Sequence, residues 1–189
     1  MKKLMLAMGM SAATLLSGPA LADTYMIDTK GAHASVNFKV PHLGYSFTKG
    51  RFNTFDGQFE FDPDNIGASS VSVTIDTTSI DSNHAERDKH IRSGDFLDVG
   101  EYGQASFEST NVTDNGDGSM TITGDLTLHG QTKPIEIDAE LVGHGEDPWG
   151  NYRAGFMGNT RLELEDFGIP TMGPATYVDM ELHVEGIRQ

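Results

Sequence analysis

Two histidines and two carboxylates fall within seven residues, at His84, Glu86, Asp88 and His90. These side-chain types bind zinc and transfer protons, so the cluster is a candidate metal or catalytic site. On an α-helix, which turns by about 100° per residue, His84 and Asp88 share one face, whereas Glu86 and His90 lie roughly 200° away from His84. The four side chains therefore do not converge on one ion, and we expect no metal site here.

The same stretch predicts a short helix near residues 84–93. Asn83 is placed to cap its N-terminus, Glu86 follows three residues later as in a capping box, and Gly94 is placed to end the helix. Acid–base pairs one turn apart support an exposed helix. We expect this helix to lie over one end of the molecule and to be architectural.

A further histidine, His42, continues the inward phase of Val36, Phe38 and Val40 if Pro41 does not interrupt the strand. A hydrogen-bonded structural histidine and a catalytic acid/base are both compatible with this position. The chain has no cysteine, no G-x-S-x-G motif and no glycine-rich phosphate loop. The sequence therefore does not predict an enzyme, and acid/base chemistry by His42 or His90 is kept as an alternative.

Acidic residues outnumber basic ones by 28 to 13, which gives a formal net charge of -15. A polyanion repels nucleic acid phosphates and anionic bilayer surfaces, and no run of Lys and Arg offsets this repulsion. We expect no nucleic acid partner and only transient membrane contact. The sequence carries no signal for an oligomeric state.

The first 22 residues have the pattern of a secretory signal peptide: two lysines, a short apolar run, and "ALA" at residues 20–22. We expect cleavage after Ala22, a mature domain of residues 23–189, and a periplasmic location. The absence of cysteine means that the exported chain has no disulfide and no lipid-bearing cysteine.

Apolar and polar residues alternate with period two along most of the chain, as in Val36, Phe38 and Val40. Strands that are apolar on one side only are typical of antiparallel sheet. Turn sequences such as "DNGDG" at 114–118 and "EDPWGN" at 146–151 separate the strands. About eight strands and one helix predict a single all-β domain, built as a sandwich or a closed barrel.

Five blocks of the sequence resemble the YceI family of secreted, lipocalin-like polyisoprenoid-binding proteins. They are "HLGYSFTKGRFNTFDGQFEFD" (42–62), "TTSIDSNHAERDKHIRSGDFLDV" (77–99), "ITGDLTLHGQTKPI" (122–135), "DPWGNYRAGF" (147–156) and "DFGI" (166–169). The resemblance covers essentially the whole mature chain. It implies an extended eight-stranded antiparallel barrel with an interior channel for an amphiphile that has an isoprenoid tail.

The apolar residues on the inward-facing side of the alternating strands are expected to line the channel. They are Phe38, Val40, Phe59, Val73, Ile75, Phe107, Ile122, Leu126, Leu128, Ile137, Leu141, Phe156, Leu162, Met180 and Leu182. Their neighbours, among them Asp125 and Asp138, should face water.

The leading functional hypothesis is a periplasmic protein that carries, stores or sequesters an isoprenoid lipid, such as a quinone or its precursor, without covalent chemistry and without a further cofactor. Position and chemistry make His42, Arg51, Arg87 and His90 the candidates for contact with the ligand's head group. Two alternatives stay open: a lipid-modifying enzyme, and a stress-related interaction protein whose barrel interior is filled by side chains.

Overall fold

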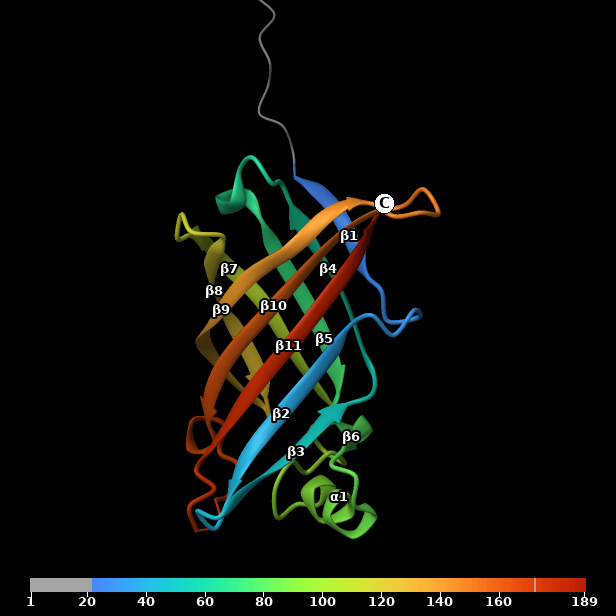
Figure 1. Cartoon of the computed structure of the whole chain (residues 1–189). Helices are drawn as coiled ribbons and strands as arrows, with labels where there is room; N and C mark the ends of the chain where they lie inside the picture. The colour runs from blue at the N-terminus through green and yellow to red at the C-terminus, as the bar shows by residue number, and fades with distance from the viewer. Residues whose placement is uncertain (1–21, 172) are drawn as a thin grey trace, which may run out of the picture.

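The computed structural model describes residues 22–171 and 173–189 (Figure 1). The expected signal peptide lies outside the described residues except for Ala22, so its cleavage and the export of the chain stay predictions. Over the described ranges, no helix has the length and apolar character needed to cross a membrane.

Eight antiparallel strands pair in a closed ring, because the last strand also pairs with the first. In their order around the barrel they are β1 (Asp23–Ile27), β4 (Phe55–Phe61), β5 (Ser70–Asp76), β7 (Gln104–Asp114), β8 (Ser119–Leu128), β9 (Gln131–Glu146), β10 (Tyr152–Glu163) and β11 (Tyr177–Arg188). The predicted all-β fold, an eight-stranded antiparallel barrel with one α-helix, is confirmed.

Three further strands lengthen the wall at one end: β2 (Ser35–His42), β3 (Ser46–Phe52) and β6 (Ile80–Asp81). Strand β11 pairs with β1 through its C-terminal part and with β2 through its N-terminal part, so β1 and β2 occupy the same position in the wall. Strand β3 pairs with β2 and with β6. The extra strands are therefore continuations of the barrel wall. The predicted count of about eight agrees with the barrel, although the alternation identified β2 and not β1.

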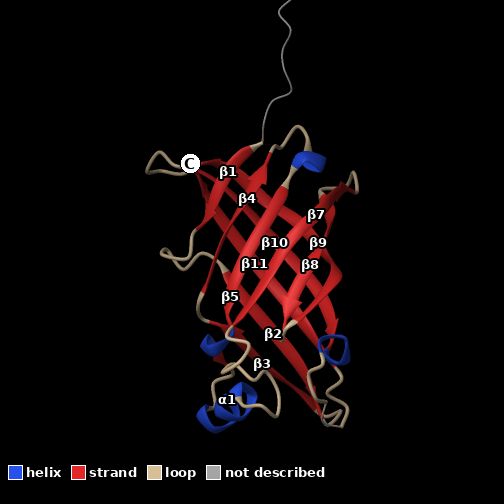
Figure 2. Cartoon of the chain, turned by 180° about the vertical axis from the view of Figure 1, so that it is seen from behind, coloured by secondary structure: helices blue, strands red, loops and turns tan. Residues whose placement is uncertain are grey.

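Within the described ranges, the helical segments lie at the two ends of the barrel (Figure 2). The helix α1 (Ala85–Arg92) lies with β6 and the β2–β3 turn at one end, here called the helix end (Figure 1). The opposite end, here called the loop end, carries the short 3-10 helix η1 (Ile66–Ala68) and the β7–β8 and β9–β10 turns. Two further 3-10 helices, η2 (Thr77–Ser79) and η3 (Leu164–Phe167), lie toward the helix end.

The predicted capping of α1 is wrong by one residue. Asn83 has a left-handed backbone (φ 61°), and His84 is the N-cap, with its Nδ1 accepting the Arg87 backbone N–H at 3.2 Å. Glu86 is therefore not the third helical residue, as a capping box requires. The C-terminal prediction also fails, because Ser93 caps the helix with its N–H and its hydroxyl both donated to the His90 carbonyl.

Candidate functional site: an apolar cavity inside the barrel

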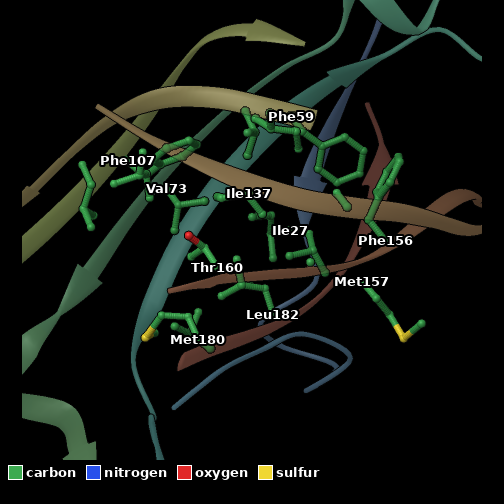
Figure 3. Close-up of a pocket in the computed structure, with 18 of the residues that line it drawn as sticks. Ile27, Phe59, Val73, Phe107, Ile137, Phe156, Met157, Thr160, Met180 and Leu182 are labelled. Carbon is green, nitrogen blue, oxygen red and sulfur yellow. The ribbon is translucent and has the colours of Figure 1, made fainter. Parts of the chain in front are cut away.

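The barrel encloses a cavity of about 160 Å³ (Figure 3). Strands on opposite sides of the barrel supply its lining, since each strand places every second side chain inward. Phe59, Val73, Phe107, Ile137 and Leu182 surround it from five different strands (Figure 3). Its lining is almost entirely hydrocarbon, so the cavity suits a ligand with an apolar tail.

Eleven of the predicted channel residues line this cavity: Phe59, Val73, Ile75, Phe107, Ile122, Leu126, Ile137, Phe156, Leu162, Met180 and Leu182. The other four point inward but pack beyond the ends of the cavity. Phe38, Val40 and Leu128 belong to the apolar cluster at the helix end, and Leu141 packs in the clusters at the loop end. Alternation gives the side on which a residue lies, but not its height along the barrel.

Several lining residues are absent from the sequence prediction, and most share its inward phase. They include Ile27, Val36, Val71, Met120, Ile135, Ala139, Thr160 and Val184. Thr160 lies between Phe156 and Leu162 at the same phase, so a stricter use of the alternation would have found it. Met157 borders the cavity but points its side chain away from it (Figure 3).

Apolar side chains pack at both ends of the cavity. At the helix end, Phe167 and Ile169 are buried, and Ile91 of α1 packs against their cluster. At the loop end, Ile66 of η1 packs against the clusters that contain Val112 and Phe61. The helix α1 therefore covers this end of the barrel through Ile91, in the position that the sequence predicts.

Glycines in the wall keep the cavity open beside large aromatic rings. A Cβ atom on any of three glycines would overlap a ring carbon of an inward-facing phenylalanine; the pairs are Gly50 with Phe38, Gly124 with Phe107, and Gly186 with Phe59. The rings therefore lie over the backbone of neighbouring strands and do not project across the barrel. Residues with a Cβ at these positions would force the rings inward.

Three hydroxyl-bearing residues, Ser69, Ser70 and Thr160, interrupt the apolar lining. The Ser69 Oγ is buried and has no hydrogen-bond partner among the described residues, and Thr160 points its hydroxyl into the cavity (Figure 3). A buried hydroxyl without a partner costs about 1 to 3 kcal/mol, so it favours any ligand atom that hydrogen-bonds to it. None of these residues was predicted, because Ser and Thr are also common in ordinary strands.

The two head-group candidates on α1 serve the helix itself. Arg87 donates from Nε to the Ser82 hydroxyl (2.7 Å) and from Nη2 to the Ser82 carbonyl (2.6 Å). His90 Nε2 lies 3.1 Å from the exposed Asp95 carboxylate. Asp88 is buried and accepts the Ser82 backbone N–H at 2.8 Å.

The other two candidates lie on the β2–β3 hairpin. His42 is exposed at the end of β2, opposite Ser46. Arg51 is exposed on β3, opposite Asp81 of β6. Hydrogen bonds from the Asn83 N–H and the Asn53 amide are the main causes that lower the pKa of Asp81, and the charge of Arg51 adds to them. The structure thus does not bring the four candidates together, and none of them lines the cavity.

Outside the cavity, Asp28, His33 and Glu185 place one ligand-type atom each within 4.8 Å of one another. An arginine already supplies the positive charge there: Arg153 Nη1 lies 2.9 Å from Asp28 and 2.5 Å from Glu185. Its Nε binds Asp147 at 2.6 Å. We therefore interpret this cluster as an ion-pair network that joins β1, β10 and β11.

This network perturbs the titration of its members. The Arg153 guanidinium, followed by the Gly31 N–H and His33, lowers the pKa of Asp28 to about 2. Arg153 likewise holds the pKa of Asp147 well below its usual range. Its three carboxylate partners raise the pKa of Arg153. All these charges are stabilised by one another at neutral pH.

Known proteins resemble the chain along its full length. A UPF0312 protein of Vibrio parahaemolyticus is 65% identical over 189 residues, covering 100% of both chains. A UPF0312 protein of Shewanella denitrificans is 55% identical over 191 residues, again covering 100% of both.

Solved structures share the fold. The Campylobacter jejuni YCEI protein matches with a TM-score of 0.72 and 26% identity, over 79% of this chain and 90% of that one. Burkholderia cenocepacia BcnA matches with a TM-score of 0.75 and 23% identity, over 84% and 98% of the two chains. A polyisoprenoid binding domain from Saccharophagus degradans matches with a TM-score of 0.61 and 14% identity, over 90% and 100%. The model of the YceI-like domain matches residues 25–186, and the chain belongs to this family.

Proposed function

We propose that this protein binds an amphiphile with a long isoprenoid tail, such as a quinone, a quinone precursor or another polyprenyl lipid, and carries, stores or sequesters it in the periplasm without covalent chemistry. The observation that carries the proposal is the apolar cavity inside the barrel. The Saccharophagus relative of the same fold, described as a polyisoprenoid binding domain, supports the choice of ligand class.

The volume of the cavity sets a condition on binding. Benzene fits an engineered apolar cavity of about 150 Å³, so 160 Å³ holds only a short part of an isoprenoid tail. A longer tail requires lining side chains to change rotamer. Met120 and Met180 are the flexible, unbranched members of the lining and are suited to this movement.

Selectivity must come from shape and polar contacts. Burial of a CH2 group from water is worth about 0.8 kcal/mol, but a tail that leaves a bilayer is already out of water. Transfer from membrane to cavity is therefore nearly balanced. Ser69 and Thr160 would then favour a ligand with a carbonyl or hydroxyl group over a pure hydrocarbon.

The competing enzyme hypothesis depends on His42 or His90. Neither histidine lines the cavity, and His90 is paired with an exposed carboxylate. A lipid held among the cavity residues would have no histidine within its binding site, so we favour binding without turnover.

Native mass spectrometry tests the proposal. Detergent-free protein is incubated with vesicles that contain a short-chain isoprenoid quinone, and we expect a 1:1 complex that returns the quinone unchanged. The matched variants are Leu126→Trp, which fills part of the cavity, and Asp125→Trp on the exposed face of the same strand. We expect the first to shorten the longest tail accepted and the second to leave uptake unchanged.

Folding of both variants is checked by circular dichroism, because overpacking costs about 1 to 3 kcal/mol. Equal uptake by the two folded variants would place the ligand outside the cavity. No uptake by the wild-type protein, across tails of different length, would contradict the proposed function itself.

A further inference from the structure

We infer that the β2–β3 hairpin, residues 35–52, is a docking surface for an anionic lipid bilayer. This inference goes beyond lipid binding in the cavity, since a surface that binds membranes does not require that the barrel carry a ligand. It depends on three features of the hairpin: exposed apolar side chains at its tip, a group of three cations on its outer face, and its place at the helix end of the barrel (Figure 1).

The tip of the hairpin exposes large apolar side chains. Leu43 is 59% exposed, Tyr45 91% and Phe47 53%, and no other five-residue stretch of the described chain exposes as many large hydrophobic residues. Leu43 also has a left-handed backbone (φ 52°), which a branched residue adopts at a cost. Turn geometry alone would favour Gly or Asn there, so the apolar side chain is not explained by the turn.

Cations gather on the outer face just behind the tip. Lys39 and Lys49 are directly opposite each other in the β2–β3 pairing, and Arg51 is opposite Asn37. Like charges at directly opposed positions destabilise a sheet. Anionic head groups at this face would remove that repulsion, whereas water only screens it.

The carboxylates near these cations are largely engaged elsewhere. Lys39 has a partner, Asp179, at 3.3 Å, but within the described chain no carboxylate oxygen lies within 4.0 Å of Lys49 or Arg51. Asp81 accepts hydrogen bonds from the Asn83 backbone and the Asn53 side chain. The positive charge of Lys49 and Arg51 is therefore available to a partner.

Apolar and basic residues also contact each other on the hairpin. The Lys39 Nζ lies 4.9 Å from the centre of the Phe47 ring, so one lysine spans from the cationic face to the apolar tip. Aromatic and apolar side chains beside lysines are suited to the boundary between lipid head groups and acyl chains. This combination favours a bilayer over a soluble anion, which would not cover Leu43 or Tyr45.

The acidic charge of the rest of the chain limits the strength of docking. Each Lys or Arg close to an anionic membrane strengthens binding by roughly five-fold, and the net charge of -15 opposes it. We expect weak, reversible and salt-sensitive binding. The inner side of the same hairpin contributes Phe38 and Val40 to the apolar cluster at the helix end, so docking brings the helix end to the bilayer.

Vesicle flotation tests the inference with phosphatidylcholine vesicles that contain 30% phosphatidylglycerol, and with pure phosphatidylcholine. Neither vesicle contains an isoprenoid, so the result is independent of cavity binding. We expect the wild-type protein to float with the anionic vesicles at low salt only. Lys39→Glu with Lys49→Glu should lower binding at least ten-fold, whereas Lys30→Glu with Lys133→Glu, which changes the net charge equally, should lower it much less.

Tryptophan fluorescence locates the contact. Trp149, the only tryptophan of the chain, is 81% exposed at the loop end and should show no spectral shift with vesicles. Tyr45→Trp in a Trp149→Phe background should shift to the blue and be quenched by brominated lipid.

Three outcomes would overturn the inference: equal binding by the two double variants, no spectral shift at position 45, or a protein that forms dimers through residues 43–47 instead of binding vesicles. Analytical ultracentrifugation of wild type and Tyr45→Ser detects the last outcome. Circular dichroism of each variant confirms that a loss of binding is not a loss of folding.

Discussion

Charged and aromatic residues are arranged differently at the two ends of the barrel. At the loop end, Arg153 is surrounded by Asp28, Asp147 and Glu185, at 2.5 to 2.9 Å. At the helix end, Lys49 has no carboxylate partner among the described residues and faces another lysine. The difference is one of arrangement, because the chain as a whole has more than twice as many acidic as basic residues.

Aromatic residues differ between the ends in the same way. Tyr25 stacks on Phe59 at the loop end, with ring centres 5.0 Å apart, and Phe61 contacts Phe156 edge to face at 5.1 Å. Tyr45 and Phe47 of the hairpin are exposed. Arg153, Tyr25 and Phe61 thus hold strands together at the loop end, whereas the hairpin at the helix end leaves Lys49, Tyr45 and Phe47 exposed.

The largest expected loss of stability comes from a buried aromatic residue at the loop end. Phe61 is 1% exposed, so Phe61→Ala should lower the free energy of unfolding by about 3 to 5 kcal/mol through lost burial and a cavity. Tyr45→Ala at the hairpin should change it by less than about 0.5 kcal/mol. Urea unfolding of both variants measures the difference. Similar losses would mean that the hairpin tip is packed in solution.

The next largest loss of stability is expected from a substitution of Gly186 at the loop end. A Cβ on Gly186 would overlap the Phe59 ring and approach Tyr25, so Gly186→Ala should cost about 1 to 3 kcal/mol. Gly143 has open space around the position of a Cβ and an ordinary backbone, and Gly143→Ala is the matched control. Thermal unfolding compares the two, and an unchanged midpoint for Gly186→Ala would contradict the close packing described here.

The ion pair between Arg153 and Asp28 predicts that the stability of the fold depends on pH. Because Arg153 lowers the pKa of Asp28 to about 2, ionised Asp28 stabilises the fold fully above about pH 4 and loses this effect as the pH falls through 2. Asp28→Asn should therefore be less stable than wild type at pH 7, and the gap should close between pH 4 and 2. Urea midpoints measured across this range test the claim. A gap that stays constant would exclude Asp28 ionisation as its source.

The smallest expected change in stability comes from the directly opposed Lys39 and Lys49. Lys49→Thr removes a like-charge pair and introduces a residue that suits strands, so it should raise stability by about 0.2 to 1 kcal/mol. Lys133→Thr, on exposed β9, is the control and should have a smaller effect. Loss of stability in Lys49→Thr would show that Lys49 has a structural role. A gain would mean that the hairpin keeps Lys49 at a cost in stability.

The hairpin contains an arrangement of charges that composition does not predict. An acidic chain without a run of basic residues argues against anionic surfaces, yet Lys39, Lys49 and Arg51 become neighbours through strand pairing. Cations two residues apart on one strand share a face, and a search for consecutive Lys and Arg does not find them. A count of charges along the sequence therefore does not report the cations that strand pairing brings together.

The sequence by itself determined the fold and the side on which most residues lie. Alternation places Leu126 and Ile137 inside and Asp125 and Asp138 outside, and the structure has the same arrangement. This succeeds because the period of two is a local property of an extended chain. Turn sequences are equally local, and they separate the strands where the structure does, as between β7 and β8.

Only the tertiary structure decided where the cavity ends, which residue caps α1, and which charges meet. Phe38 and Leu141 have the inward phase but pack beyond the cavity. Asn83 has a left-handed backbone in the β6–α1 turn, and His84 is therefore the N-cap residue. Arg153 and Asp28 are 125 positions apart. Height along the barrel and contact between distant strands depend on register and closure, which arise only when all eight strands have paired.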